Sequence, residues 1–197
     1  EETSEDFSAV DVLKKDSFGR TELMKAVKEG NDWQIRNLIK FGIDVNACDE
    51  DGWTALMYAA RFQSNLSIID MLLSENAVVR MENNFGQNAL ILAAIYNNNP
   101  EVLKRLLEFY LPTDKDVHKA FVQLLAEPQI SEKTLLAKIK VFISIGLPLN
   151  SSKETITKLA IIPICCEIII LIIQLIKFQK NVNVQSSKAG KIKTWVI

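Results

Sequence analysis

Histidine and cysteine are scarce in this chain of 197 residues, and their scarcity excludes most of the common catalytic devices. A Ser-His-Asp or Cys-His arrangement would have to use the single histidine, His118, and no nucleophile motif lies near it. The chain also lacks a GxGxxG loop, a P-loop, an HExxH pair and a CxxC pair. We therefore predict that the protein is not an enzyme and binds no cofactor or metal ion.

The three cysteines are Cys48, Cys165 and Cys166, an odd number whose spacing fits neither a disulfide framework nor a metal site. We interpret all three as small apolar residues. This pattern favours a reducing compartment such as the cytoplasm. Secretion remains open, because no initiator methionine precedes Glu1 and a signal peptide would be removed from a secreted protein.

Charge of one sign is not in large excess, because the formal net charge is −1 at pH 7. Residues 1–50 carry 12 acidic and 7 basic side chains, whereas residues 151–197 carry 2 acidic and 7 basic side chains. The basic end could orient an acidic partner or could be a solvated tail. No basic stripe with interleaved aromatic residues appears, so we do not expect nucleic-acid binding.

What the chain does contain is a pattern that recurs about every 33 residues in its first half. Each copy is a glycine, then Thr or Asn two residues later, then an apolar segment that contains alanine, and the copies begin at Gly19, Gly52 and Gly86. Repeats of this length are typical of a solenoid of stacked units, none of which can bury its apolar face alone. A solenoid presents a long concave surface, which indicates binding rather than catalysis.

Each early copy predicts two short helices joined by a turn and followed by a hairpin-like loop. In the first copy, Thr21 is expected to cap the first helix. Gly30 breaks this helix, and Gly42, which can take the left-handed conformation, ends the second. The predicted apolar faces of the two helices consist of Leu23, Ala26, Val27, Trp33, Ile35, Leu38 and Ile39.

Two stretches around the second copy carry a resemblance to a known family. Residues 49–56 read DEDGWTAL, and residues 41–47 read FGIDVNA. They match the D-x-x-G-x-T-P-L and G-A-D-V-N-A segments of the ankyrin repeat, which the chain resembles over residues 16–110. The proline and the histidine of the family's T-P-L-H motif are absent, and their places are taken by Glu22, Ala55 and Ala89 and by Met24, Met57 and Ile91.

The second half of the chain keeps the same spacing with weaker matches. Asn150 and Asn183 stand where Asn46 stands, at intervals of 104 and 33 residues, which are close to three repeats and one repeat. Residues 1–197 are therefore expected to form one all-α ankyrin-type helix-turn-helix solenoid of five to six repeats, the C-terminal ones degenerate. The predicted repeats are residues 16–49, 50–83, 84–113, 114–150 and 151–183, with a partial repeat at 184–197.

One long apolar run, residues 159–176, is close to the ~20 residues that a helix needs to span a bilayer. Pro163 interrupts the run where a turn between two helices should fall, and Glu167 and Gln174 would be costly at membrane depth. We therefore interpret the run as two buried repeat helices rather than a membrane span. Self-association through the isoleucine-rich C-terminal half is a further alternative.

The resemblance implies that loop tips and outer positions of the first helix of each repeat contact a partner protein. Trp, Tyr and Arg dominate binding energy when they are buried at an interface. Trp53 has no evident need within the repeat core, although both Trp53 and Phe85 could instead pack on neighbouring turns. The expected partner-binding residues are Phe18, Arg20, Lys28, Glu50, Asp51, Trp53, Arg61, Phe62, Phe85, Gln87, Ile95 and Tyr96.

The predicted function is non-catalytic binding of a partner protein on the concave face. A second hypothesis is that the chain is the regulatory or targeting part of a larger enzyme or membrane protein. A third is a small-molecule-responsive or ion-responsive protein that uses His118 and the acidic turn at residues 49–51, although that turn lacks the EF-hand spacing.

Overall fold

The computed structural model describes residues 14–110 and 113–144, which form a stack of helix pairs. The eight helices of this part are α2 (Glu22–Glu29), α3 (Asp32–Lys40), α4 (Ala55–Phe62), α5 (Leu66–Ser74), α6 (Ala89–Tyr96), α7 (Pro100–Phe109), α8 (Asp114–Ala126) and α9 (Glu132–Ser144). No strand occurs in the same residues. The predicted all-α helix-turn-helix solenoid is confirmed.

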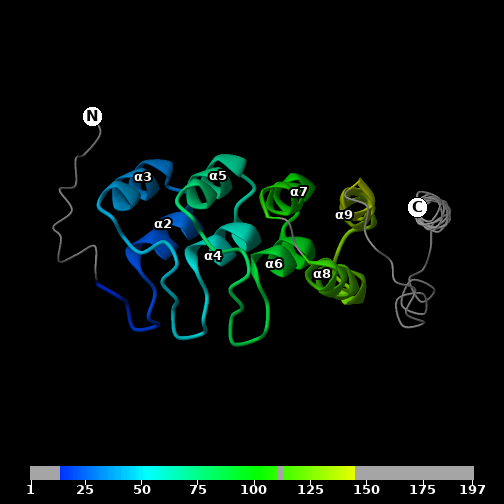
Figure 1. Cartoon of the computed structure of the whole chain (residues 1–197), viewed down its shortest axis with the longest axis horizontal. Coiled ribbons are helices and arrows are strands. Elements are labelled where there is room, and N and C mark those ends of the chain that lie inside the picture. The colour runs from blue at the N-terminus through cyan, green and yellow to red at the C-terminus, as the bar shows by residue number, and fades with distance from the viewer. Residues whose placement is uncertain (1–13, 111–112, 145–197) are drawn as a thin grey trace, which may run out of the picture.

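The helices form two layers (Figure 1). The inner layer contains α2, α4, α6 and α8, and the outer layer contains α3, α5, α7 and α9. Consecutive helices contact each other within each layer, and the two helices of each pair contact each other between the layers. Three long loops project from the inner layer, on the side away from the outer layer: one leads into α2, and two join one helix pair to the next (Figure 1).

Every inner helix begins at a Thr or Asn whose side-chain oxygen accepts a hydrogen bond from the backbone N–H three residues later. Such a cap satisfies one of the backbone donors that a helix leaves unpaired, and its loss costs about 1 kcal/mol. The predicted cap at Thr21 is confirmed. The four capping residues are Thr21, Thr54, Asn88 and Thr113.

The core lies between the layers and between successive pairs. Small side chains of the inner helices let the pairs approach closely, and the fully buried alanines are Ala26, Ala59, Ala60, Ala93, Ala94 and Ala120. In α3 the buried face is formed by Ile35 and Leu38. The prediction that Trp33 lines this face is wrong, because its side chain is 42% exposed. Trp33 precedes Ile35 by two residues, about 200° around the helix, which places it on the opposite side.

Each long loop ends in the same turn, because an Asp or Asn side chain folds the chain back on itself. The Oδ1 atoms of Asp16, Asp49 and Asn83 each accept hydrogen bonds from the backbone N–H groups two and four residues later. The turn also needs a residue with positive φ, and Gly52 supplies it in the second loop with φ of 78°. Short-range sequence therefore determines the shape of these turns.

Neighbouring turns are joined through their backbones. The N–H of Glu50 donates to the carbonyl of Phe18 at 3.1 Å, and the N–H of Asn84 donates to the carbonyl of Asp51 at 2.9 Å. The three turns thus form a short ladder whose side chains are held at fixed spacing along the stack.

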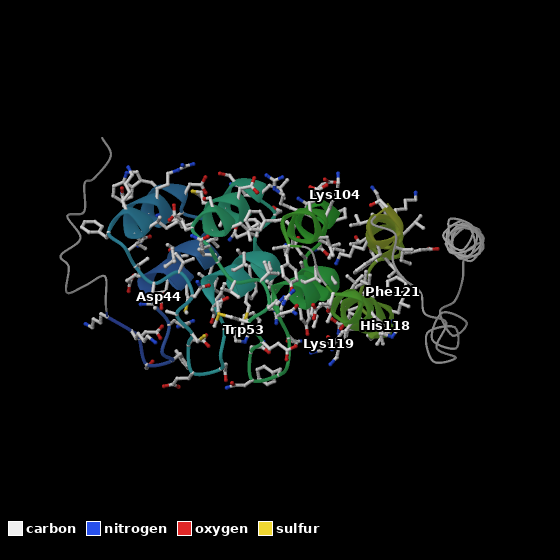
Figure 2. The ribbon with its side chains drawn as sticks, in the orientation of Figure 1. Asp44, Trp53, Lys104, His118, Lys119 and Phe121 are labelled. Atoms are coloured by element: carbon white, nitrogen blue, oxygen red, sulfur yellow. The ribbon has the colours of Figure 1, made fainter. Side chains whose placement is uncertain are left out.

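The ladder ends at the third turn. Fourteen residues separate α3 from α4 and α5 from α6, whereas only four separate α7 from α8, so the fourth pair has no comparable loop. Lys119 of α8 lies beside the third loop instead (Figure 2). Its Nζ donates to the carbonyl of Gly86 at 2.8 Å and to Oε1 of Glu82 at 2.6 Å.

The C-terminal ends of three inner helices are capped by side chains from the next pair of helices. In each case the acceptor is the backbone carbonyl two residues before the last residue of the helix, in the last turn, where carbonyls lack the usual helical donor four residues later. Neutral amides serve at α2 and α4, and a lysine serves at α6. The donor and acceptor residues are Gln63 and Val27 at 2.7 Å, Asn97 and Ala60 at 2.9 Å, and Lys138 and Ala94 at 2.7 Å.

Several predictions concern residues outside the described ranges. They are the repeat at 151–183, the partial repeat at 184–197, the apolar run at 159–176, the proposed self-association face and the residues Cys165 and Cys166. Within residues 14–110 and 113–144, no helix has the length and apolar character that a membrane crossing requires.

Candidate partner-binding surface

The predicted residues occupy three zones of one side of the stack. Phe18, Glu50, Asp51 and Phe85 lie at the tips of the turns, and all four side chains are exposed. Because the turns are joined by backbone hydrogen bonds, these four side chains are carried on a common support. We call the turns together with the exposed ends of α2, α4 and α6 the inner face.

The second zone is the base of each turn, where Arg20, Trp53 and Gln87 are half-buried. Trp53 lies between its loop and α4 (Figure 2) and packs against the hydrophobic core. The sequence left open whether Trp53 packs within the fold, and the structure shows that it does. The indole serves the fold as well as the surface, and its removal would mix a packing loss with any loss of binding.

The third zone is the C-terminal end of each inner helix. Lys28 lies in the last turn of α2. Arg61 and Phe62 are the last two residues of α4, and Tyr96 is the last residue of α6. Ile95 stands one residue before Tyr96, but its side chain is only 7% exposed and belongs to the core. Ile95 is therefore left out of the candidate surface.

Arg61 is the centre of a group of aromatic rings from two neighbouring repeats. Its guanidinium carbon, Cζ, lies 4.1 Å from the ring centroid of Tyr96, 5.2 Å from that of Phe62 and 5.5 Å from that of Trp53. A cation at these distances is attracted to the ring faces, with about 0.5–1 kcal/mol for each exposed pair. The arrangement holds Arg61 in place without an ion pair from the described residues.

Two further side chains extend this group towards α2. The ammonium of Lys28 lies 5.6 Å from the ring centroid of Phe62. The ring of Tyr58 lies 6.2 Å from that of Phe62 in a stacked arrangement and 5.3 Å from that of Trp53 in a tilted one. We call the six residues that make these contacts the cation–aromatic cluster; they are Lys28, Trp53, Tyr58, Arg61, Phe62 and Tyr96.

Tyr58 ties the cluster to the second turn and was not identified from the sequence. Its hydroxyl donates to Oδ2 of Asp49 at 2.7 Å. Burial and this hydrogen bond raise the pKa of Tyr58 well above its usual range, so the phenol stays neutral and remains a donor. The available signal was the spacing of four residues between Tyr58 and Phe62, which places both rings on one side of a helix.

A pocket of about 340 Å³ opens beside the cluster, between α2 and α4. Two of its cations already hold carboxylates: Arg20 pairs with Asp16 at 2.8 Å and Lys25 pairs with Glu22 at 2.7 Å. The six lining residues are Arg20, Met24, Lys25, Lys28, Glu29 and Tyr58.

Among the residues proposed for an ion-responsive site, Asp49 is already engaged in hydrogen bonds within the protein. Asp49 accepts hydrogen bonds at both carboxylate oxygens, from two backbone N–H groups and from Tyr58. His118 lies half-buried on α8. In the part of the chain that the structure describes, no group of three or more His, Cys, Asp or Glu side chains is placed to hold a metal ion.

Stacked helix pairs with joined turns along one edge define a helical repeat protein, a solenoid. The sequence pattern described as "Ankyrin repeats (3 copies)" matches residues 5–83 and 23–119, together more than half of the chain. The chain belongs to the ankyrin-repeat family. Ankyrin repeats are generally protein–protein interaction modules and are typically not catalytic.

The chain is similar to parts of longer proteins. It is 40% identical over 63 residues to an ankyrin repeat protein of fowlpox virus, which covers 32% of this chain and 14% of that protein. It is 36% identical over 99 residues to an ankyrin repeat protein of Rickettsia bellii, and the match covers 48% of this chain and 52% of that protein. It is 31% identical over 101 residues to ankyrin repeat, SAM and basic leucine zipper domain-containing protein 1 of Ovis aries, and the match covers 51% of this chain and 21% of that protein. The matched part therefore spans about half or less of each relative.

Proposed function

We propose that the protein binds a partner protein on the inner face and that the cation–aromatic cluster is the centre of the contact. The observation that carries this proposal is the position of Arg61 among three rings from two repeats, two of which, those of Phe62 and Tyr96, are exposed. Arginine and aromatic side chains give most of the binding energy when a partner covers them.

The exposed rings of the cluster, Phe62 and Tyr96, are better suited to binding than to stabilising the fold, whereas Trp53 and Tyr58 also pack against the core. The core beneath it is complete, since Ala59 and Ala60 are fully buried on the same helix, while the ring of Phe62 is 47% exposed. Each charged side chain of the cluster is held against a ring, so part of the side-chain entropy is lost before a partner arrives. Such preorganisation lowers the cost of association.

The test compares two phenylalanines that end neighbouring helices on different layers. Phe62 is the last residue of α4 and belongs to the inner face. Phe41 is similarly exposed, but it lies at the end of α3 in the outer layer. Affinity capture from the source cells would use the wild-type chain, Phe62→Ala and Phe41→Ala, read by mass spectrometry. We expect Phe41→Ala to retain the wild-type partner and Phe62→Ala to lose it, with at least about a tenfold weaker Kd for the isolated pair.

Two results would contradict this proposal. Equal capture by all three proteins would place the contact away from the inner face. Loss of capture by Phe41→Ala alone would place it on the outer layer. Far-UV circular dichroism and urea unfolding of each variant would separate lost binding from a lost fold.

A second candidate function is a regulatory or targeting role within a larger protein. The observation that favours it is that the Ovis aries relative carries SAM and basic leucine zipper domains by name, and that the match covers 21% of its length. The reading frame of the gene tests this directly. A frame that encodes no folded domain on either side of the repeats would remove this candidate and leave the binding proposal unchanged.

A further inference from the structure

Two cations from neighbouring repeats lie near one exposed ring. The Nζ of Lys28 on α2 is 5.6 Å from the ring centroid of Phe62, and Cζ of Arg61 on α4 is 5.2 Å from the same centroid. A cation–π contact at an exposed site gives only about 0.5–1 kcal/mol, so the ring does not neutralise either charge. The two positive charges therefore converge on the same small region of the inner face.

Neither cation has a carboxylate partner among residues 14–110 and 113–144. The salt bridges of this part of the chain, with N–O distances up to 4.0 Å, involve Arg20, Lys25, Lys104, Arg105 and Lys119. Lys28 and Arg61 are absent from these pairs. Glu29 is the sequence neighbour of Lys28 and lines the same pocket, but it forms no ion pair with Lys28.

The space beside Lys28 can take a side chain of a partner, although Arg61 and Phe62 do not line it. The pocket of about 340 Å³ between α2 and α4 is lined by Lys28 itself and by two more cations, Arg20 and Lys25. Each of these two holds one carboxylate and keeps further N–H donors, because an ammonium has three and a guanidinium has five. Glu29 is the single carboxylate among the six lining residues.

The turn tips have the opposite charge. Glu50 and Asp51 are exposed at the second tip and take no part in the salt bridges of the described residues. A partner segment with negative charge along its whole length would be repelled there, whereas a single acidic residue near the helix ends would not. The inner face thus distinguishes an isolated carboxylate from a polyanion.

We infer that the partner is a protein segment that presents one aspartate or glutamate side chain to the inner face, beside the Phe62 ring and between Lys28 and Arg61. This inference rests on the proposed function and adds the chemistry of its central contact. The ring edge of a phenylalanine is electropositive, so a carboxylate is accommodated next to it. Charge-assisted hydrogen bonds from Lys28 and Arg61 would then give the acidic residue its specificity.

The test uses a displayed library of random peptides, selected on the full chain. We expect the selected peptides to share one Asp or Glu position and to require Phe62. Replacing that acidic residue by its amide in a synthetic peptide should weaken binding about fivefold, the scale of a partly exposed charge pair, and less at high salt. On a Lys28→Gln variant the difference between the acidic and amide peptides should shrink, whereas on a Lys40→Gln control, in the outer layer, it should persist.

The outcomes separate this inference from the proposed function. Peptides that require Phe62 but bind equally well with the acid or the amide would overturn the acidic-partner inference and leave the inner face as the binding surface. Failure to select any peptide that requires Phe62 would overturn both. A Lys28→Glu variant that prefers a peptide with lysine at the acidic position would support the direct pairing.

Discussion

Lys138 provides the sharpest prediction about stability, because it caps the end of an inner helix with a lysine, whereas neutral amides cap the two preceding inner helices. Its side chain is 0% exposed, and its Nζ donates to the carbonyl of Ala94 at the end of α6. Burial lowers the pKa of Lys138 from 10.5 to about 8. The perturbation is Lys138→Met, which keeps an unbranched side chain of similar length and removes the titrating group.

The sign follows from the number of protons bound in each state. Below pH 8 the lysine is charged in both states, so the folded state carries the whole cost of a buried charge. Between pH 8 and 10.5 the folded lysine is neutral while the unfolded lysine is still protonated, so the free energy of unfolding rises with pH. A difference of this size corresponds to about 3 kcal/mol of added stability across that window.

The assay is urea unfolding of the full chain, followed by far-UV circular dichroism at several values between pH 7 and pH 10.5. Other groups titrate equally in both proteins, so the informative quantity is the difference between wild type and Lys138→Met. We expect this difference to shift in favour of the wild type by about 3 kcal/mol as pH rises. A constant difference, or a shift in favour of the variant, would refute the account of Lys138 as a buried cation.

Two further substitutions test the contacts between repeats by urea unfolding. Gly52→Ala should lower the free energy of unfolding by roughly 2 kcal/mol or more, because the added Cβ would lie 3.2 Å from backbone atoms of the third turn. The control is Gly42→Ala, at a similar φ but with no atom within 4 Å of the added Cβ, which should lower the free energy of unfolding by only about 1 kcal/mol. Equal losses would argue against the ladder. Asn97→Ala should lower the free energy of unfolding by about 2 kcal/mol, since two backbone carbonyls of the preceding repeat lose their donor. The control, Asn98→Ala at an exposed position, should be nearly neutral. Similar losses at both positions would contradict the capping role of Asn97.

The helices and turns were predictable because they depend on residues close together in the sequence. The cap at Thr21 and the break at Gly30 follow from local preferences, and both are observed. Trp33 was misplaced because an aromatic residue near a helix start was counted with the apolar face, although its angular position is opposite to that of Ile35. Periodicity, not residue type, decides the buried face.

The candidate surface was only partly predictable, because its contacts join residues from different repeats. Arg61 could be placed on the surface from its position, but its stacking on Tyr96 depends on the distance between α4 and α6. Ile95 stands at the matching place in the next helix and turns inward, since an apolar side chain gains from burial where a guanidinium cannot. The donor–acceptor pair of Lys138 and Ala94 spans 44 residues, and no local pattern indicates it.

Two of the lysines of the fourth helix pair explain where the candidate surface stops. Lys119 covers the third turn at Gly86, where a fourth turn would otherwise continue the ladder, and Lys138 replaces the amide that caps the preceding inner helix. Both lysines donate to backbone carbonyls of the third repeat. The connection between α7 and α8 is too short to form a projecting turn of its own. A partner that binds the turn tips would therefore contact the first three repeats, and the fourth helix pair packs against the third repeat without adding a turn to the surface. Substitutions on the exposed face of α8 should consequently change stability more than affinity.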